Sequence, residues 1–140
     1  MKNSFYIAGG DLRSVYLAKL LFEEGHDVKV FKMEDADLPK EMEQIKNIDD
    51  FNKAKNVILP LPCCDEKGFL KTAFSKEKIS LSEIVEKMPE GSVLMGGLLP
   101  EKIISISKKQ KISVCDYYRR EEFAVRNAAL TAEAAAAKFF

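Results

Sequence analysis

The chain has 140 residues, enough for one domain of ordinary size, and its 22 basic and 22 acidic residues cancel. A chain of this length buries roughly two-thirds of its unfolded surface, and without net charge it has no overall field to attract nucleic acid or an anionic membrane. Its three cysteines lack Cys-x-x-Cys spacing and its only histidine, His26, is far from them in sequence, which argues against a zinc site.

The chain begins with a predicted strand, helix and strand in close succession. Residues 4–8 are an apolar run typical of a buried strand, residues 12–24 suit a helix, and residues 27–32 suit a second strand. Gly25 stands where the glycine after a helix belongs. So short a unit predicts a right-handed parallel crossover.

The pattern is less regular in residues 33–55. Pro39 is a candidate helix start there, and Ile45 and Ile48 lie on a candidate short strand. The next buried strand, within residues 56–62, is stopped by its two prolines, which cannot donate a hydrogen bond to a neighbouring strand.

The second half of the chain repeats the alternation of helices and strands. The lysine-rich residues 63–78 suggest an excursion over the strand ends rather than core. Four elements then have start signals or apolar runs: a helix opened by a capping box at residues 80–83, a strand at 92–95, a helix opened by Pro100, and a strand at 112–115.

The last predicted element is a long alanine-rich helix from about Arg120 to the end of the chain. It has no glycine or proline to stop it, and one side is made of small residues. We therefore divide the chain into an α/β domain, residues 1–118, and a linker or hinge helix, residues 119–140, of a protein that continues further. The alternative is a plain C-terminal core helix.

Together these elements predict a doubly wound, mostly parallel α/β sheet, a three-layer sandwich of the Rossmann or flavodoxin type. Ligands of such sheets bind outside the carboxyl ends of the strands, where the strand order reverses. Three strand ends carry unusual residues and form a candidate cleft: Gly9, Gly10 and Asp11; Pro60 and Pro62; Gly96 and Gly97.

The residues after the first strand suit an anionic ligand. Glycines let a ligand approach the backbone, N–H groups of the following helix favour an anion, and Arg13 could clamp a carboxylate or phosphate. The alternative is that Asp11 caps the helix and Arg13 is solvated. A dinucleotide fingerprint is not supported, because only Gly9 matches among its three glycine places, and we assign no cofactor-binding residue.

Several of these motifs, in order and spacing, resemble a known family. They are Gly9-Gly10-Asp11 with Arg13, Leu59-Pro60-Leu61-Pro62, Gly96-Gly97, Asp116-Tyr117 with Arg120-Glu121-Glu122, Asn127, and Thr131-Ala132-Glu133. The chain resembles the N-terminal domain of the dipicolinate synthase A subunit. The sequence departs from the family pattern at two positions in the predicted hinge helix. Leu130 stands where a proline is expected, and Ala134 stands where a glycine is expected.

The resemblance implies NADP-dependent oxidation of dihydrodipicolinate to dipicolinate during endospore formation. It implies that a second domain holds NADP, that the B subunit of the synthase is a partner, and that the protein works in the cytoplasm of the mother cell; a homo-oligomer is compatible. It places ten residues at the substrate and no catalytic acid or base: Gly9, Gly10, Asp11, Arg13, Pro60, Pro62, Gly96, Gly97, Arg120 and Glu121. We expect the isolated chain to be inactive.

Two other functions stay open from the sequence. The first is a nucleotide-sensing regulatory module with a Rossmann-like fold, in which Glu34 after the second strand would contact a ribose. The second is a structural module that docks a partner subunit through the alanine-rich helix.

Overall fold

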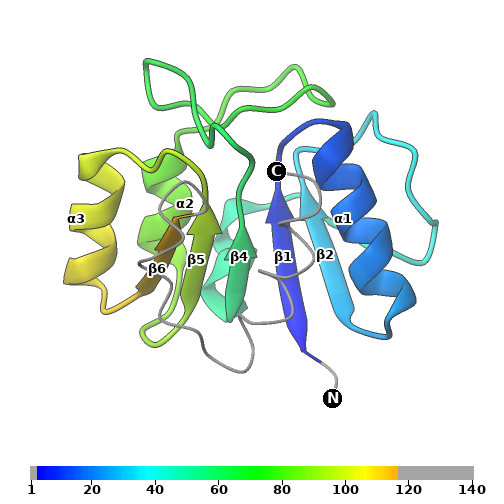
Figure 1. Ribbon diagram of the computed structural model, residues 1–140, viewed down its shortest axis with the longest axis horizontal. Helices are drawn as coiled ribbons and strands as arrows, with labels where there is room; N and C mark the ends of the chain where they lie inside the picture. The colour runs from blue at the N-terminus through cyan, green and yellow to red at the C-terminus, as the bar shows by residue number, and fades with distance from the viewer. Residues whose placement is uncertain (1–2, 117–140) are drawn as a thin grey trace.

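A computed structural model describes residues 3–116, which form one six-stranded parallel sheet (Figure 1). The strands are β1 (Ser4–Ala8), β2 (Asp27–Phe31), β3 (Glu43–Ile45), β4 (Asn56–Ile58), β5 (Val93–Gly96) and β6 (Ser113–Asp116). Their order in space is β3-β2-β1-β4-β5-β6, so the chain reverses its direction of travel between β1 and β4. The predicted doubly wound α/β fold is confirmed.

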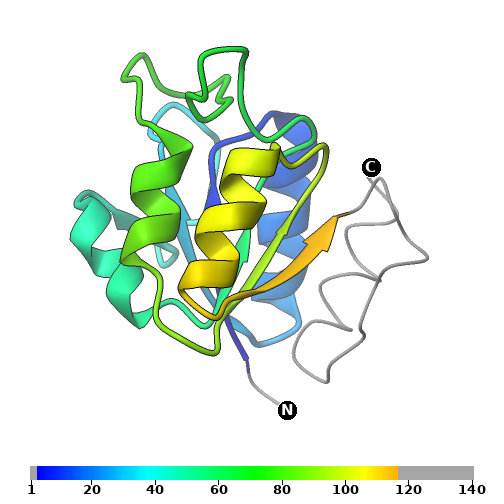
Figure 2. The ribbon, with the colours of Figure 1, turned by 90° about the vertical axis from the view of Figure 1, so that its left-hand side faces the viewer.

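Helices cover both faces of the sheet. They are α1 (Leu12–Glu23), the 3-10 helix η1 (Ile48–Lys53), α2 (Leu81–Lys87) and α3 (Glu101–Lys109). Figures 1 and 2 show α1 on one face and η1, α2 and α3 on the other. None of the helices within residues 3–116 is long and apolar enough to span a membrane.

The core consists of two apolar layers that share the central strand. Because successive side chains of a strand point to opposite faces, Phe5 and Ile7 of β1 pack in the α1 layer while Tyr6 packs in the other. In that second layer the ring of Phe51, on η1, lies 5.2 Å from the ring of Phe31 on β2. Burial of each such side chain contributes about 1.5–3 kcal/mol.

Helix α1 begins and ends with the signals that its sequence carries. The Asp11 side chain accepts a hydrogen bond from the backbone N–H of Arg13 at 2.9 Å, so Asp11 is the N-cap. At the other end Gly25 has φ +91°, and the N–H of His26 bonds the carbonyl of Leu21 at 3.1 Å. This is a Schellman ending, as the position of Gly25 predicts.

Some local predictions were wrong. No helix starts at Pro39; residues 33–42 form turns because Met33 and Met42 are both anchored in the core. Only Glu43–Ile45 is a strand, and Ile48 begins η1. Ser80 is the N-cap of α2, but its hydroxyl bonds the hydroxyl of Ser82 at 2.9 Å, so the predicted capping box does not form.

The predicted helix from Arg120 lies outside the described residues, and so do two predicted site residues, Arg120 and Glu121.

Candidate functional site

A small hollow lies where the strand order reverses, at the carboxyl ends of β1 and β4. We call it the switch-point cleft; its volume is about 280 Å³. The lining residues are Gly10, Asp11, Arg13, Pro60, Leu61, Pro62, Lys71, Thr72 and Ala73. This is the position at which doubly wound sheets bind their ligands.

Asp11 and Arg13 form a connected pair on one wall of the cleft. The Nε and Nη2 groups of Arg13 donate to the two carboxylate oxygens of Asp11 at 3.2 and 3.1 Å. Burial of Asp11 opposes ionisation, but the hydrogen bonds and charge of Arg13 outweigh it and lower the pKa of this carboxyl below its usual value. Asp11 is therefore ionised at neutral pH, and α1 already has an anion at its first turn.

Arg13 also reaches the opposite wall of the cleft. Its Nη2 group donates to the carbonyl oxygen of Leu61 at 2.9 Å. Leu61 precedes Pro62 through a cis peptide bond, just after β4. One guanidinium thus joins the start of α1 to the segment that leaves β4.

The chain after β4 is also tied to the end of β5. The N–H of Gly97 donates to the Pro60 carbonyl at 3.4 Å, and the N–H of Cys63 donates to the Gly97 carbonyl at 3.2 Å. The buried Asp116 carboxylate accepts the N–H groups of Leu98 and Leu99, each at 3.2 Å. The predicted strand ends are therefore linked. Gly97 does not line the cleft itself but packs against Leu61, which does.

The top of the cleft is made by residues 70–73, which we call the crossing segment. In Figure 1 the chain between β4 and α2 passes over the carboxyl edge of the sheet, as the sequence predicts. Gly10 donates to the Lys71 carbonyl and accepts from the N–H of Ala73, both at 2.8 Å. The hydroxyl of Thr72 donates to the Lys32 carbonyl at 2.6 Å, which fixes the segment against the end of β2.

The crossing segment explains Gly9, and helix α1 explains Gly10. A Cβ atom at Gly9, where φ is +63°, would lie 2.5 Å from the Lys71 carbonyl oxygen, and one at Gly10 would overlap the Ser14 side chain. Chain, rather than free space, therefore lies over this turn. A pyrophosphate would need open space over this turn and a helix start without another anion. The crossing segment covers the turn and the Asp11 carboxylate caps the helix, so these residues do not fit a dinucleotide.

The structure brings together half of the predicted site. Gly10, Asp11, Arg13, Pro60 and Pro62 line the cleft. Gly9 is buried under the crossing segment, and Gly96 and Gly97 pack against Leu59 and Leu61, so these three glycines do not line it. Four lining residues are not among the predicted ones: Leu61, which lies between Pro60 and Pro62, and Lys71, Thr72 and Ala73. The lysine-rich composition of residues 63–78 indicated the segment but no single residue in it.

The two adjacent cysteines beside the cleft have little thiolate character. The sulfur atoms of Cys63 and Cys64 lie 3.9 Å apart, and Cys63 is fully buried. Burial raises the pKa of both thiols, with a further increase at Cys63 from its neighbour Cys64. Within residues 3–116 no group of three or more His, Cys, Asp or Glu side chains is placed to hold a metal ion.

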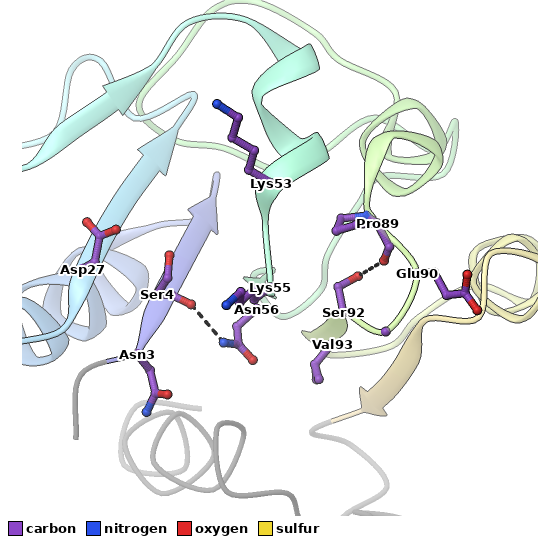
Figure 3. Close-up of a pocket in the computed structure, with 11 residues that line it drawn as sticks. Asn3, Ser4, Asp27, Lys53, Lys55, Asn56, Pro89, Glu90, Ser92 and Val93 are labelled. Carbon is purple, nitrogen blue, oxygen red and sulfur yellow. Dashed lines mark hydrogen bonds between the residues drawn. The ribbon is translucent and has the colours of Figure 1, made fainter.

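A larger hollow, of about 800 Å³, lies at the opposite edge of the sheet (Figure 3). It is lined by the first residues of four strands, Ser4, Asp27, Asn56 and Val93. The side-chain amide of Asn56 donates to the Ser4 carbonyl at 2.9 Å, which ties β4 to β1. We place the candidate site at the smaller cleft because ligands of parallel sheets bind at the carboxyl ends of the strands.

His26 also lies at this amino edge rather than at the cleft. It is only 9% exposed, accepts a hydrogen bond from the N–H of Asn3 at 3.1 Å, and packs edge-on against Phe5. It has a structural role here.

Comparison with known proteins gives one family and a consistent fold. The model of the N-terminal domain of the dipicolinate synthase A subunit matches residues 4–118. The dipicolinate synthase A subunit from Bacillus halodurans is similar, with a TM-score of 0.75 and 23% identity over 86% of this chain and 42% of that one. The A chain of dipicolinate synthase from Bacillus subtilis gives a TM-score of 0.73 and 23% identity over 91% of this chain and 44% of that one.

At this identity the two solved structures support the fold alone. The chain spans less than half the length of either of them. No curated protein sequence matches it.

Proposed function

The chain belongs to the family of N-terminal domains of the dipicolinate synthase A subunit, and from this membership we propose that it is the substrate-side domain of an oxidoreductase. The proposed reaction is the NADP-dependent oxidation of dihydrodipicolinate to dipicolinate. The observation that carries the proposal is the family match over residues 4–118, which includes every residue of the switch-point cleft.

The cleft has the chemistry expected for a small anionic substrate. Arg13 and Lys71 line it together with one acid, Asp11, so its lining carries a local positive excess in a chain with no net charge. A ring with two carboxylates needs such a site, because each carboxylate loses water on binding and must gain charged or polar partners. We assign binding and orientation to this domain, and no proton transfer.

NADP is proposed to bind mainly to another part of the protein. This is supported by the crossing segment over Gly9 and by the Asp11 carboxylate at the start of α1, neither of which suits a pyrophosphate. The same two features weigh against the alternative of a nucleotide-sensing module at this turn.

Family membership also supports the wider parts of the proposal. They are assembly with the B subunit of dipicolinate synthase and a location in the cytoplasm of the mother cell during sporulation.

The test is an activity assay on the full-length protein that contains this chain, with the B subunit, dihydrodipicolinate and NADP. We expect dipicolinate and NADPH to form together, and neither to form with residues 1–140 alone. Absence of dipicolinate from the complete system would overturn the proposed function. NADP reduction by residues 1–140 alone would contradict the division between the two domains.

A further inference from the structure

We propose that Lys71 is the cationic group that contacts a carboxylate of the substrate in the switch-point cleft, and that Arg13 acts by holding the cleft wall in place. The inference rests on the proposed function and assigns different work to the two cations. From sequence alone Arg13 is the candidate clamp, and no pattern indicates Lys71.

The first step is that Arg13 is already committed to the protein. Its guanidinium donates to both carboxylate oxygens of Asp11 and to the Leu61 carbonyl, at 2.9–3.2 Å. A substrate carboxylate would have to compete with the ionised Asp11 for these N–H groups. Arg13 therefore acts by holding Leu61 and Pro62 in place, and these two residues form the opposite wall of the cleft.

The second step is that the backbone of Lys71 is fixed at the cleft. Its carbonyl accepts from Gly10 at 2.8 Å, and its N–H donates to the Cys63 carbonyl at 3.2 Å. The next residue, Thr72, is held by its bond to Lys32. Because the Cα of Lys71 is anchored from both sides, only side-chain freedom remains to be lost when its ammonium group binds an anion.

The third step concerns the ammonium group itself. The Lys71 side chain is exposed, and no hydrogen bond or ion pair joins its Nζ atom to any residue of the described range 3–116. Its charge acts on the nearby Asp65, but without a hydrogen bond or ion pair in that range its N–H donors stay available to a ligand. In this respect Lys71 differs from Lys32, which is paired with Glu77 at 3.2 Å.

The fourth step is the position of Lys71 between two hollows. It lines the switch-point cleft and also an adjoining hollow of about 400 Å³, whose lining includes Lys67 and Lys78. Two acids line this hollow as well, Asp65 and Glu66, and the N–H groups of Lys67 and Phe69 keep Asp65 ionised through hydrogen bonds of 2.9 and 3.0 Å. Its three lysines still leave an excess of one positive charge, which favours a second negative group, as a dicarboxylate provides.

The experiment is calorimetric titration of the full-length protein with two probes, dipicolinate and its monocarboxylate analogue picolinate. The variants are Lys71→Met, Arg13→Ala, and Lys76→Met as a matched control. Lys76 is an exposed lysine of the same loop that lines neither hollow, so its replacement removes an equal charge.

We expect Lys71→Met to weaken dipicolinate about tenfold and to reduce the preference for dipicolinate over picolinate by a similar factor, because one carboxylate contact is lost. Arg13→Ala should weaken both probes alike and leave that preference unchanged. Lys76→Met should bind both probes as the unmodified protein does.

Three results would go against these expectations, and they differ in what they overturn. If Lys71→Met binds both probes as tightly as Lys76→Met, the role of Lys71 is wrong while the proposed function stands. If the preference for dipicolinate is lost in Arg13→Ala and kept in Lys71→Met, Arg13 is the carboxylate contact instead. If the unmodified protein does not bind dipicolinate, the proposed function fails, and this inference fails with it.

Discussion

At the scale of single residues, the turn after β1 has a different purpose from the one its sequence indicates. Gly9 and Gly10 suggest a place where a ligand can approach the backbone. In the structure the close approach to Gly9 is made by the crossing segment, through the Lys71 carbonyl and the Leu70 side chain, and the close approach to Gly10 is made by the Ser14 side chain of α1. The glycines are needed because other parts of the chain occupy the space that a Cβ atom would fill.

Substitution of Gly9 by alanine tests this. Gly9 and Gly25 both have positive φ, but a Cβ at Gly25 would meet nothing within 4 Å. We expect Gly25→Ala to cost about 1 kcal/mol from backbone strain alone, and Gly9→Ala to cost about 1–3 kcal/mol more, because the Lys71 carbonyl must move. Urea unfolding curves measure both free energies of unfolding. Equal losses of stability in the two variants would mean that the Lys71 carbonyl does not exclude a Cβ atom at Gly9.

The residues around this turn also show what a sequence can and cannot predict. That Asp11 caps α1 follows from its neighbours in the chain, and the structure confirms it. The bond from Arg13 to the Leu61 carbonyl joins residues 48 positions apart, and no local pattern reports such a contact. For the same reason Lys71 was missed, since its place in the cleft depends on how Gly10 and Cys63 pair with it.

At the scale of elements, the segment between β4 and α2 is held by local hydrogen bonds as well as by the sheet. Asp65 Oδ1 accepts the N–H groups of Lys67 and Phe69, and the N–H of Asp65 bonds the Phe69 carbonyl at 2.9 Å. These bonds shape the turn that leads into the crossing segment.

The turn at Asp65 should depend on pH. The N–H of Phe69, chiefly, lowers the pKa of the Asp65 carboxyl below its ordinary value. A carboxyl whose folded pKa is lowered stabilises the fold above its unfolded pKa, about 3.9, and this contribution is lost as the pH falls through the folded pKa. Carbon-13 NMR titration should therefore give Asp65 a midpoint below the ordinary value of about 3.9, and a midpoint at or above that value would contradict the assigned hydrogen bonds.

Long apolar runs predicted the elements of the sheet well, whereas short and polar segments did not. Runs such as residues 4–8 gave strands within a residue or two of their observed bounds, because burial on both faces demands a continuous apolar sequence. In residues 33–55 the structure is decided by a few anchors such as Met33 and Phe51. Local preference is overruled there by contacts that form only in the complete fold.

At the scale of the whole molecule, the strands differ in how well they are protected. β1 lies between β2 and β4, and its residues Phe5–Ala8 are all buried. β3 is a three-residue strand at one edge of the sheet, with Glu43 and Gln44 exposed.

Hydrogen exchange should follow this order. Amides of β1 and β4 should exchange most slowly, through unfolding of the whole domain, while amides of β3 should exchange through local opening that costs much less free energy. Mass spectrometry of exchanged peptides measures this directly. Equal protection of β3 and β1 would show that the edge strand belongs to the same cooperative unit.

The pairing of Gly10 with Thr72 has a consequence for the biosynthesis of the domain. The two residues are about sixty positions apart, so β1, α1 and β2 can emerge from the ribosome and associate long before their partner exists. Closing so large a loop is entropically costly until neighbouring contacts are in place. We expect a nascent chain that has not yet exposed the crossing segment to hold part of a folded sheet but no switch-point cleft.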